Sequence, residues 1–98
     1  MQTSLPYNLE LLEKQLKTAP LSSIASIIKR DWGNTAYSAT PYLRAMFSLG
    51  DIRENYFADH ASDIVLYFLS NASSWRGGVA RLVKAELKAR LEELQNGN

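Results

Sequence analysis

The amino-acid sequence predicts an all-α protein, folded as a compact single-domain bundle of four to five helices. The chain has 98 residues, which suits one domain and is too short for two. Apolar residues make up 46% of the chain, enough for a buried core. Between the prolines and glycines, aliphatic residues recur every three or four positions, which is the spacing of amphipathic helices. We therefore expect a single helical domain over residues 1–98, with a disordered tail at about 95–98.

The first two helices are predicted over residues 8–17 and about 22–32. Each carries a stripe of aliphatic side chains at helical spacing, made of Leu9, Leu12 and Leu16 in the first and of Ile24, Ile27 and Ile28 in the second. Pro20 follows the first helix, and the glycine–asparagine pair at 33–34 suits a left-handed end to the second.

A third helix is predicted to start at Thr40, which we expect to be its N-cap, with Pro41 in the first helical position. Its inward-facing residues are predicted to be Leu43, Met46 and Phe47. Gly50 is expected to end it. The next segment, Asp-Ile-Arg-Glu at 51–54, resembles a capping box and predicts a short helix or turn.

The fourth helix is predicted to start near Asp59. Its inner stripe is expected to comprise Ala61, Ile64, Val65, Phe68 and Ala72. Leu66, Tyr67 and Leu69 make it apolar on nearly every side, which is typical of a helix at the centre of a bundle. The run IVLYFL at 64–69 could also form a strand. We favour a helix because Asp59 offers a cap and no partner strand is evident elsewhere.

The fifth helix is predicted to begin at Ser74 or Trp75, to end at about Leu94, and to pack against the fourth. Its apolar face is expected to comprise Val79, Val83, Leu87, Leu91 and Leu94. The opposite face is basic, with Arg81, Lys84 and Lys88. Glu86 and Arg90 are four residues apart in the favourable order and are expected to flank the apolar seam.

Three of these segments, ATPYLRAM, DIVLYFLSNASSWRGGVARLVKAEL and the earlier KRDW, resemble a group of small uncharacterised bacterial proteins. The similarity covers most of residues 20–92. Its most specific part is the tryptophan–arginine–glycine turn followed by Ala80 and Arg81, in a pattern of the form YFLSNAxxWRGxxAR. No activity is established for that group. The resemblance therefore implies a bacterial, cytoplasmic setting and assigns no catalytic residue.

Composition narrows the functional classes. The formal net charge of +1 argues against a strongly electrostatic nucleic-acid binder, although a local basic face is compatible with it. The absence of cysteine excludes disulfides, thiol catalysis and cysteine-ligated metal sites. The N-terminal residues lack the pattern of a signal peptide, and the longest apolar run, 64–69, is far shorter than the ~20 residues that span a bilayer. We expect a cytoplasmic protein with no membrane contact and no cofactor.

His60 is the sole histidine of the chain. On a helix it would share a face with Asp63 and Tyr67, where acid–base chemistry or weak metal binding is conceivable. We favour the simpler interpretation, in which Asp59 and Asp63 stabilise a helix N-terminus. The sequence contains no Gly-x-Ser-x-Gly, Walker, dinucleotide-binding or HExxH motif. We therefore expect a protein that is not an enzyme and that has no metal site.

The segment SSWRGG, residues 73–78, places two glycines where the fifth helix is predicted to begin. Glycine inside a helix costs about 1 kcal/mol relative to alanine, so the pair requires an explanation. One explanation is an anion-binding site at the start of the helix. Its ligand would be held by Ser73, Ser74, Arg76, Gly77 and Gly78. The other, which we favour, is a helix corner in which Trp75 packs inward and the glycines let a neighbouring helix approach.

The leading functional hypothesis is a non-enzymatic adaptor or regulator that acts through an unidentified protein partner or as a homodimer. One alternative is a nucleic-acid-associated factor that uses Arg76 and the basic face of the fifth helix. That face could equally be a solvated helix surface, which we favour. The second alternative is an anion- or phosphate-binding module at 73–78.

Overall fold

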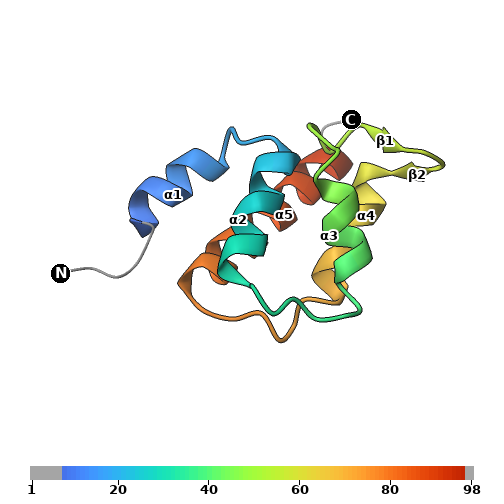
Figure 1. Ribbon diagram of the computed structural model, residues 1–98. Helices are drawn as coiled ribbons and strands as arrows, with labels where there is room; N and C mark the ends of the chain where they lie inside the picture. The colour runs from blue at the N-terminus through green and yellow to red at the C-terminus, as the bar shows by residue number, and fades with distance from the viewer. Residues whose placement is uncertain (1–7, 97–98) are drawn as a thin grey trace.

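Helices and one small β-hairpin, joined by turns and loops, form the fold (Figure 1). The computed structural model describes residues 8–96. Within that range the elements, in chain order, are α1 (Leu9–Leu16), α2 (Leu21–Asp31), α3 (Thr40–Met46), β1 (Asn55–Tyr56), β2 (Asp59–His60), α4 (Ala61–Ser70) and α5 (Gly78–Asn96). The predicted fold class, a compact bundle of helices, is confirmed.

Helix α5 is the longest element, and three of the other helices pack against it. It contacts α1, α2 and α4, while α3 packs against both α2 and α4. Figure 1 shows α5 passing behind α2, with α1 at one end of the molecule and the hairpin at the other. All five helices contribute to one core, whose largest fully buried side chains are Phe68, Leu12, Leu16, Leu21, Ile24, Ile28, Met46, Leu87, Val65 and Val83. Within residues 8–96, no polar or charged residue is buried.

The first two helices begin in different ways. The side chain of Asn8 accepts hydrogen bonds from the backbone N–H groups of Glu10 and Leu11, so it is the N-cap of α1. Helix α2 has no side-chain cap. Its Leu21 and Ser22 N–H groups instead donate to the carbonyls of residues 50 and 49, each at 2.8 Å. Backbone carbonyls of the turn after α3 therefore accept hydrogen bonds from the first N–H groups of α2. No pattern in the neighbouring sequence could indicate this cap.

The predicted fourth helix begins two residues after Asp59, and Asp59 does not cap it, because a β-hairpin occupies residues 55–60. Asn55 pairs with His60 and Tyr56 with Asp59 in antiparallel register. Helix α4 starts at Ala61, whose N–H donates to the carbonyl of residue 54 at 2.8 Å. Residues 57–58 form the two-residue turn. They lack the Asn-Gly signature of such turns, which is why no hairpin was predicted here. The preference for a helix over 64–69 is confirmed.

Helix α4 is not at the centre of the bundle. Its predicted inner stripe is buried, but Leu66 and Tyr67 on its outer side are each 48% exposed. The reason is that α4 contacts α3, α5 and β2, and these neighbours cover only part of its circumference. Phe47, predicted to face inward, is 43% exposed and lies at the C-cap of α3, directly after the buried Met46.

Three predicted boundaries also shift. Thr40 is the first residue of α3 rather than its N-cap, and its hydroxyl donates to the carbonyl of Ala36 at 3.1 Å. Helix α5 begins at Gly78, three or four residues later than predicted. It continues to Asn96, so residues 95–96 of the predicted disordered tail are helical. Residues 97–98 of that tail lie outside the described part of the chain.

Candidate functional site

The turn between α4 and α5, residues 71–77, is organised around the Trp75 side chain. Trp75 is 2% exposed. Its ring stacks on Trp32 with the centroids 5.7 Å apart, and it meets the edge of Phe68 at 6.3 Å. Its indole Nε1–H donates to the Asp31 carboxylate at 2.8 Å. The inward packing of this tryptophan, one part of the corner interpretation, is therefore observed.

Lys84 holds the same turn from the side of α5. Its ammonium group donates to the carbonyls of Ala72 at 2.7 Å and Trp75 at 2.6 Å, and it lies 5.8 Å from the centroid of the Trp75 ring. Partial burial lowers the pKa of Lys84, and the positive charges of Lys88 and Arg76 lower it further. Of the predicted basic face, Arg81 and Lys88 are exposed, whereas Lys84 is partly buried and two backbone carbonyls bind its ammonium group.

The two glycines of the turn have different roles. Gly77 has a φ of +114°, a conformation that side chains rarely adopt, and its surroundings are open. At Gly78 an added Cβ would lie 2.9 Å from Cδ1 of Leu9 on α1. Only Gly78 therefore allows a close helix approach, whereas Gly77 permits the backbone to enter α5 with a positive φ. Neither glycine lies in a helix interior, because Gly78 is the first residue of α5.

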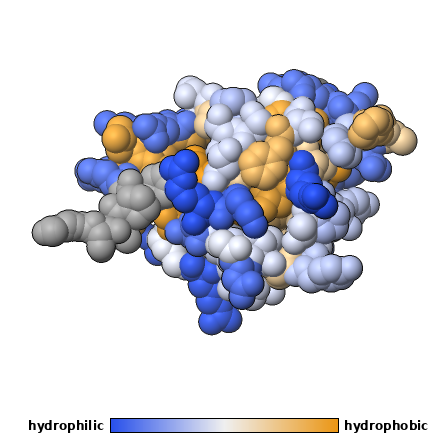
Figure 2. Space-filling model, in the orientation of Figure 1, coloured by the Kyte–Doolittle hydropathy of each residue, from blue (hydrophilic) through white to orange (hydrophobic). Residues whose placement is uncertain are grey.

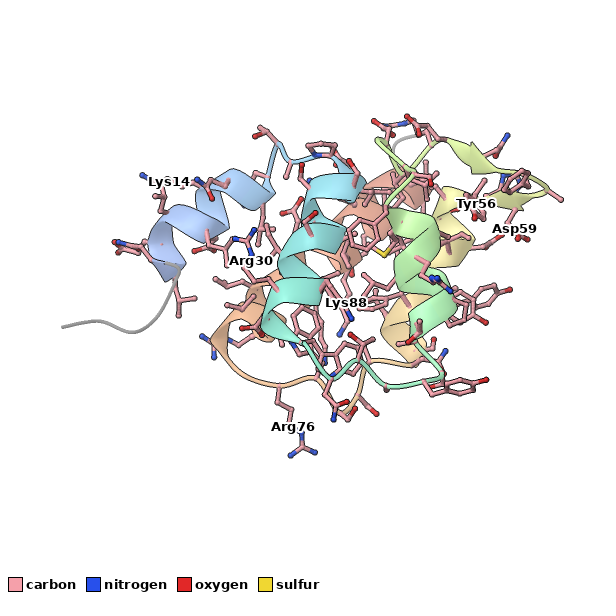
Figure 3. All side chains as sticks on the ribbon, viewed as in Figure 1. Lys14, Arg30, Tyr56, Asp59, Arg76 and Lys88 are labelled. Atoms are coloured by element: carbon pink, nitrogen blue, oxygen red, sulfur yellow. The ribbon has the colours of Figure 1, made fainter. Side chains whose placement is uncertain are left out.

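The residues proposed for an anion site lie mostly at the surface. Ser73, Ser74, Arg76 and Gly77 are exposed, and Gly78 is half-buried against α1. Figure 3 shows Arg76 extending away from the body of the protein. Packing explains why a tryptophan stands at position 75 and a glycine at position 78. Anion binding at 73–78 stays a prediction.

His60 lies in the hairpin instead of on a helix face. Its Nδ1 is 2.9 Å from the side-chain oxygen of Asn55, and the whole residue is exposed. Asp59 is exposed beside it at the end of the hairpin (Figure 3). Within residues 8–96, no group of three histidine, aspartate or glutamate residues is placed to hold a metal ion.

Arg90 makes two contacts, of which only the first was predicted from the sequence. The predicted ion pair with Glu86 is present at 2.8 Å, and both side chains are about 15% exposed. Arg90 also donates to the carbonyl of Leu16, the last residue of α1. This second contact joins residues 74 positions apart. It therefore could not be recognised from spacing along one helix.

The described surface contains several large apolar side chains with exposed fractions of 43% or more: Leu11, Tyr37, Phe47, Phe57, Leu66 and Tyr67. Leu66 and Tyr67 belong to a continuous region on the outer side of α4, which we call the α4 surface. On one side, the Tyr67 ring lies 5.5 Å from that of Tyr42 on α3. On the other, Leu66 and Leu69 line a groove of about 370 Å³ shared with Leu91 of α5.

Comparisons with protein-family models, with curated proteins and with solved structures found no match. The resemblance of residues 20–92 to small bacterial proteins therefore stays a prediction. No helix in the described range is long and apolar enough to cross a bilayer.

Proposed function

We propose that this protein is a non-enzymatic interaction module of the bacterial cytoplasm, an adaptor or regulator that binds another protein or a second copy of itself. The observation that supports the proposal is the α4 surface. The most apolar helix of the chain leaves Leu66 and Tyr67 about half exposed, beside a groove that continues to α5. Neighbouring exposed apolar side chains of this kind are typical of a contact region, in which aromatic residues often contribute most of the affinity.

The proposal is tested by capture of proteins from a lysate of the native host on the immobilised full chain. Leu66→Glu places a charge in the α4 surface and is expected to abolish capture of the specific partner. Leu11→Glu is the matched control, because Leu11 is a similarly exposed leucine (54%) on α1. Retention of the same proteins by Leu66→Glu, or capture of nothing above background by the unmodified chain together with monomeric sedimentation, would contradict the proposal.

Sedimentation of the purified chain separates the two kinds of partner. If the α4 surface binds a second copy, the sedimentation coefficient rises with concentration, and Leu66→Glu removes the rise. If the partner is another protein, the chain sediments as a monomer throughout the range, and only the lysate experiment gives a signal.

Nucleic-acid binding through α5 is the second proposal, supported by the exposure of Arg76, Arg81 and Lys88. Its support is weaker, because Lys84 is held by the 71–77 turn and Glu92 adds negative charge to the last turns of α5. Binding of a random-sequence duplex, measured by fluorescence anisotropy, should weaken with added salt and with Arg81→Gln if this proposal is correct.

A further inference from the structure

A second groove lies between α2 and α3, apart from the α4 surface. It has a volume of about 540 Å³. Its walls are formed by Lys29, Thr35, Thr40, Leu43, Arg44 and Phe47. Figure 2 shows apolar atoms exposed between α2 and α3, with strongly hydrophilic side chains beside them. The groove thus combines an apolar region with a charged rim.

The apolar region is made by two residues of the α3 segment. Leu43 is 3% exposed and forms part of the core, whereas the Phe47 ring is 43% exposed. The hydroxyls of Thr35 and Thr40 donate to backbone carbonyls of residues 32 and 36, so both side chains are fixed in place. Such a hollow suits one large apolar side chain, which would be buried mainly against the Phe47 ring.

The charged rim is entirely cationic. Lys29 and Arg44 are exposed, and neither takes part in an ion pair within the described residues. No carboxylate lines the groove. The nearest acidic residue along α2, Asp31, accepts the hydrogen bond from the Trp75 indole in the core corner. Within the described residues, neither of the two cations beside the apolar region is therefore paired with a carboxylate.

We propose that this groove binds a short acidic segment of another protein, in which one large apolar side chain is flanked by aspartate or glutamate. The apolar side chain would rest on Phe47, and the flanking carboxylates would meet Lys29 and Arg44. The inference rests on the proposed function, because it too makes the protein an interaction module. It assigns the contact to the groove between α2 and α3 instead of the α4 surface. Opposite charges at an exposed rim speed association and select partners, and their effect is weakened by salt.

The experiment is selection from a phage-displayed library of random peptides on the immobilised full chain. Enriched sequences are expected to carry an aromatic or large aliphatic residue flanked by acidic residues. A fluorescein-labelled peptide of the enriched sequence then gives the affinity by anisotropy. Arg44→Glu is expected to weaken binding by about tenfold or more, and so is raising sodium chloride from about 50 to about 500 mM. Phe47→Glu should abolish binding.

Leu66→Glu on the α4 surface is the matched control and should leave the peptide affinity unchanged. Circular dichroism of each variant checks the fold, and Arg44→Glu is informative even if Phe47→Glu fails to fold, because Arg44 is exposed. Enrichment of basic or uncharged peptides, no enrichment, or loss of binding in Leu66→Glu but not in Arg44→Glu would overturn the inference. If lysate capture through the α4 surface succeeds while the selection fails, the inference alone is wrong and the proposed function stands.

Discussion

Phe57 lies at the tip of the hairpin, is 89% exposed and has a backbone φ of 55°. It is the one residue other than glycine with a positive φ in the described range. Such a conformation costs about 1–2 kcal/mol for most side chains and less for asparagine. The edge contact of its ring with Tyr56, at 4.8 Å, offsets part of this cost.

We predict that Phe57→Asn raises the free energy of unfolding by about 0.5–1 kcal/mol, because asparagine tolerates the left-handed backbone. Urea denaturation measures the change. Tyr37→Asn is the control: Tyr37 is 95% exposed, but its φ is negative, so this substitution should give no gain. Equal effects of the two substitutions would contradict the strain argument.

The two glycines at the start of α5 should respond differently to alanine. Gly77→Ala is expected to cost about 1–2 kcal/mol, because alanine is strained at a φ of +114°. Gly78→Ala should cost less than about 1 kcal/mol, because the close atom is the end of the flexible Leu9 side chain, which can move. Thermal or chemical denaturation gives the order, and a larger cost at Gly78 would show that packing against α1 dominates.

Lys84 should titrate below its ordinary value of 10.5, because burial and the charges of Lys88 and Arg76 disfavour its charged form. Between the folded and unfolded pKa values the unfolded chain binds more protons, so the contribution of Lys84 to stability increases as pH rises through that window. We predict that Lys88→Gln moves the pKa of Lys84 part of the way back toward 10.5. The pKa would stay below 10.5 in this variant, because burial is the largest cause of the lowering and is not removed.

NMR titration of the Lys84 side chain measures this pKa directly. Arg76→Gln is the comparison and should raise it by less, because the charge of Arg76 is the smaller cause. A pKa of 10.5 or above in the unmodified protein would mean that the carbonyls of Ala72 and Trp75 stabilise the ammonium group more than burial destabilises it.

Helix α4 has one side in the core and one side in solvent, and adjacent residues test this division. Phe68 is 0% exposed and meets the rings of Trp32 and Trp75 edge-on at 6.3 Å. Phe68→Ala is expected to lower the free energy of unfolding by about 3–5 kcal/mol, because it leaves a cavity beside two tryptophans. Tyr67→Ala, one position along, should cost only about 1 kcal/mol. Similar losses in chemical denaturation would contradict the exposed position of Tyr67.

Long-range contacts hold the first helix onto the rest of the protein. Arg90 of α5 binds the carbonyl at the end of α1 and is fixed by its ion pair with Glu86. We predict that Arg90→Met increases hydrogen exchange of the α1 amides by about tenfold or more while leaving α4 unchanged, because hydrogen bonds from charged groups contribute about 1.5–3 kcal/mol. Arg53→Met is the control, since its ion pair with Asp51 is largely exposed and of small value. Uniform exchange changes across the chain would mean that α1 does not open separately.

The approximate positions of the helices followed from the sequence, because the aliphatic spacing acts on neighbouring residues, whereas the expected caps Thr40 and Asp59 do not cap α3 and α4. The buried residues of α2 include the predicted Ile24 and Ile28, with Ile27 partly buried, and those of α4 include Phe68. The pair of Glu86 and Arg90 was predictable for the same reason, since both lie on one helix. The inward packing of Trp75 agreed with one of two open interpretations of residues 73–78.

Several features that required the folded structure depend on contacts between different elements. The carbonyls of residues 49 and 50 cap α2, and the 71–77 turn draws Lys84 inward from the predicted basic face. The exposure of Leu66 and the groove at Phe47 were not predictable either. Periodicity shows which side of a helix is apolar, but how much of that side is covered depends on where the neighbouring helices end, and that is set by packing across the whole chain.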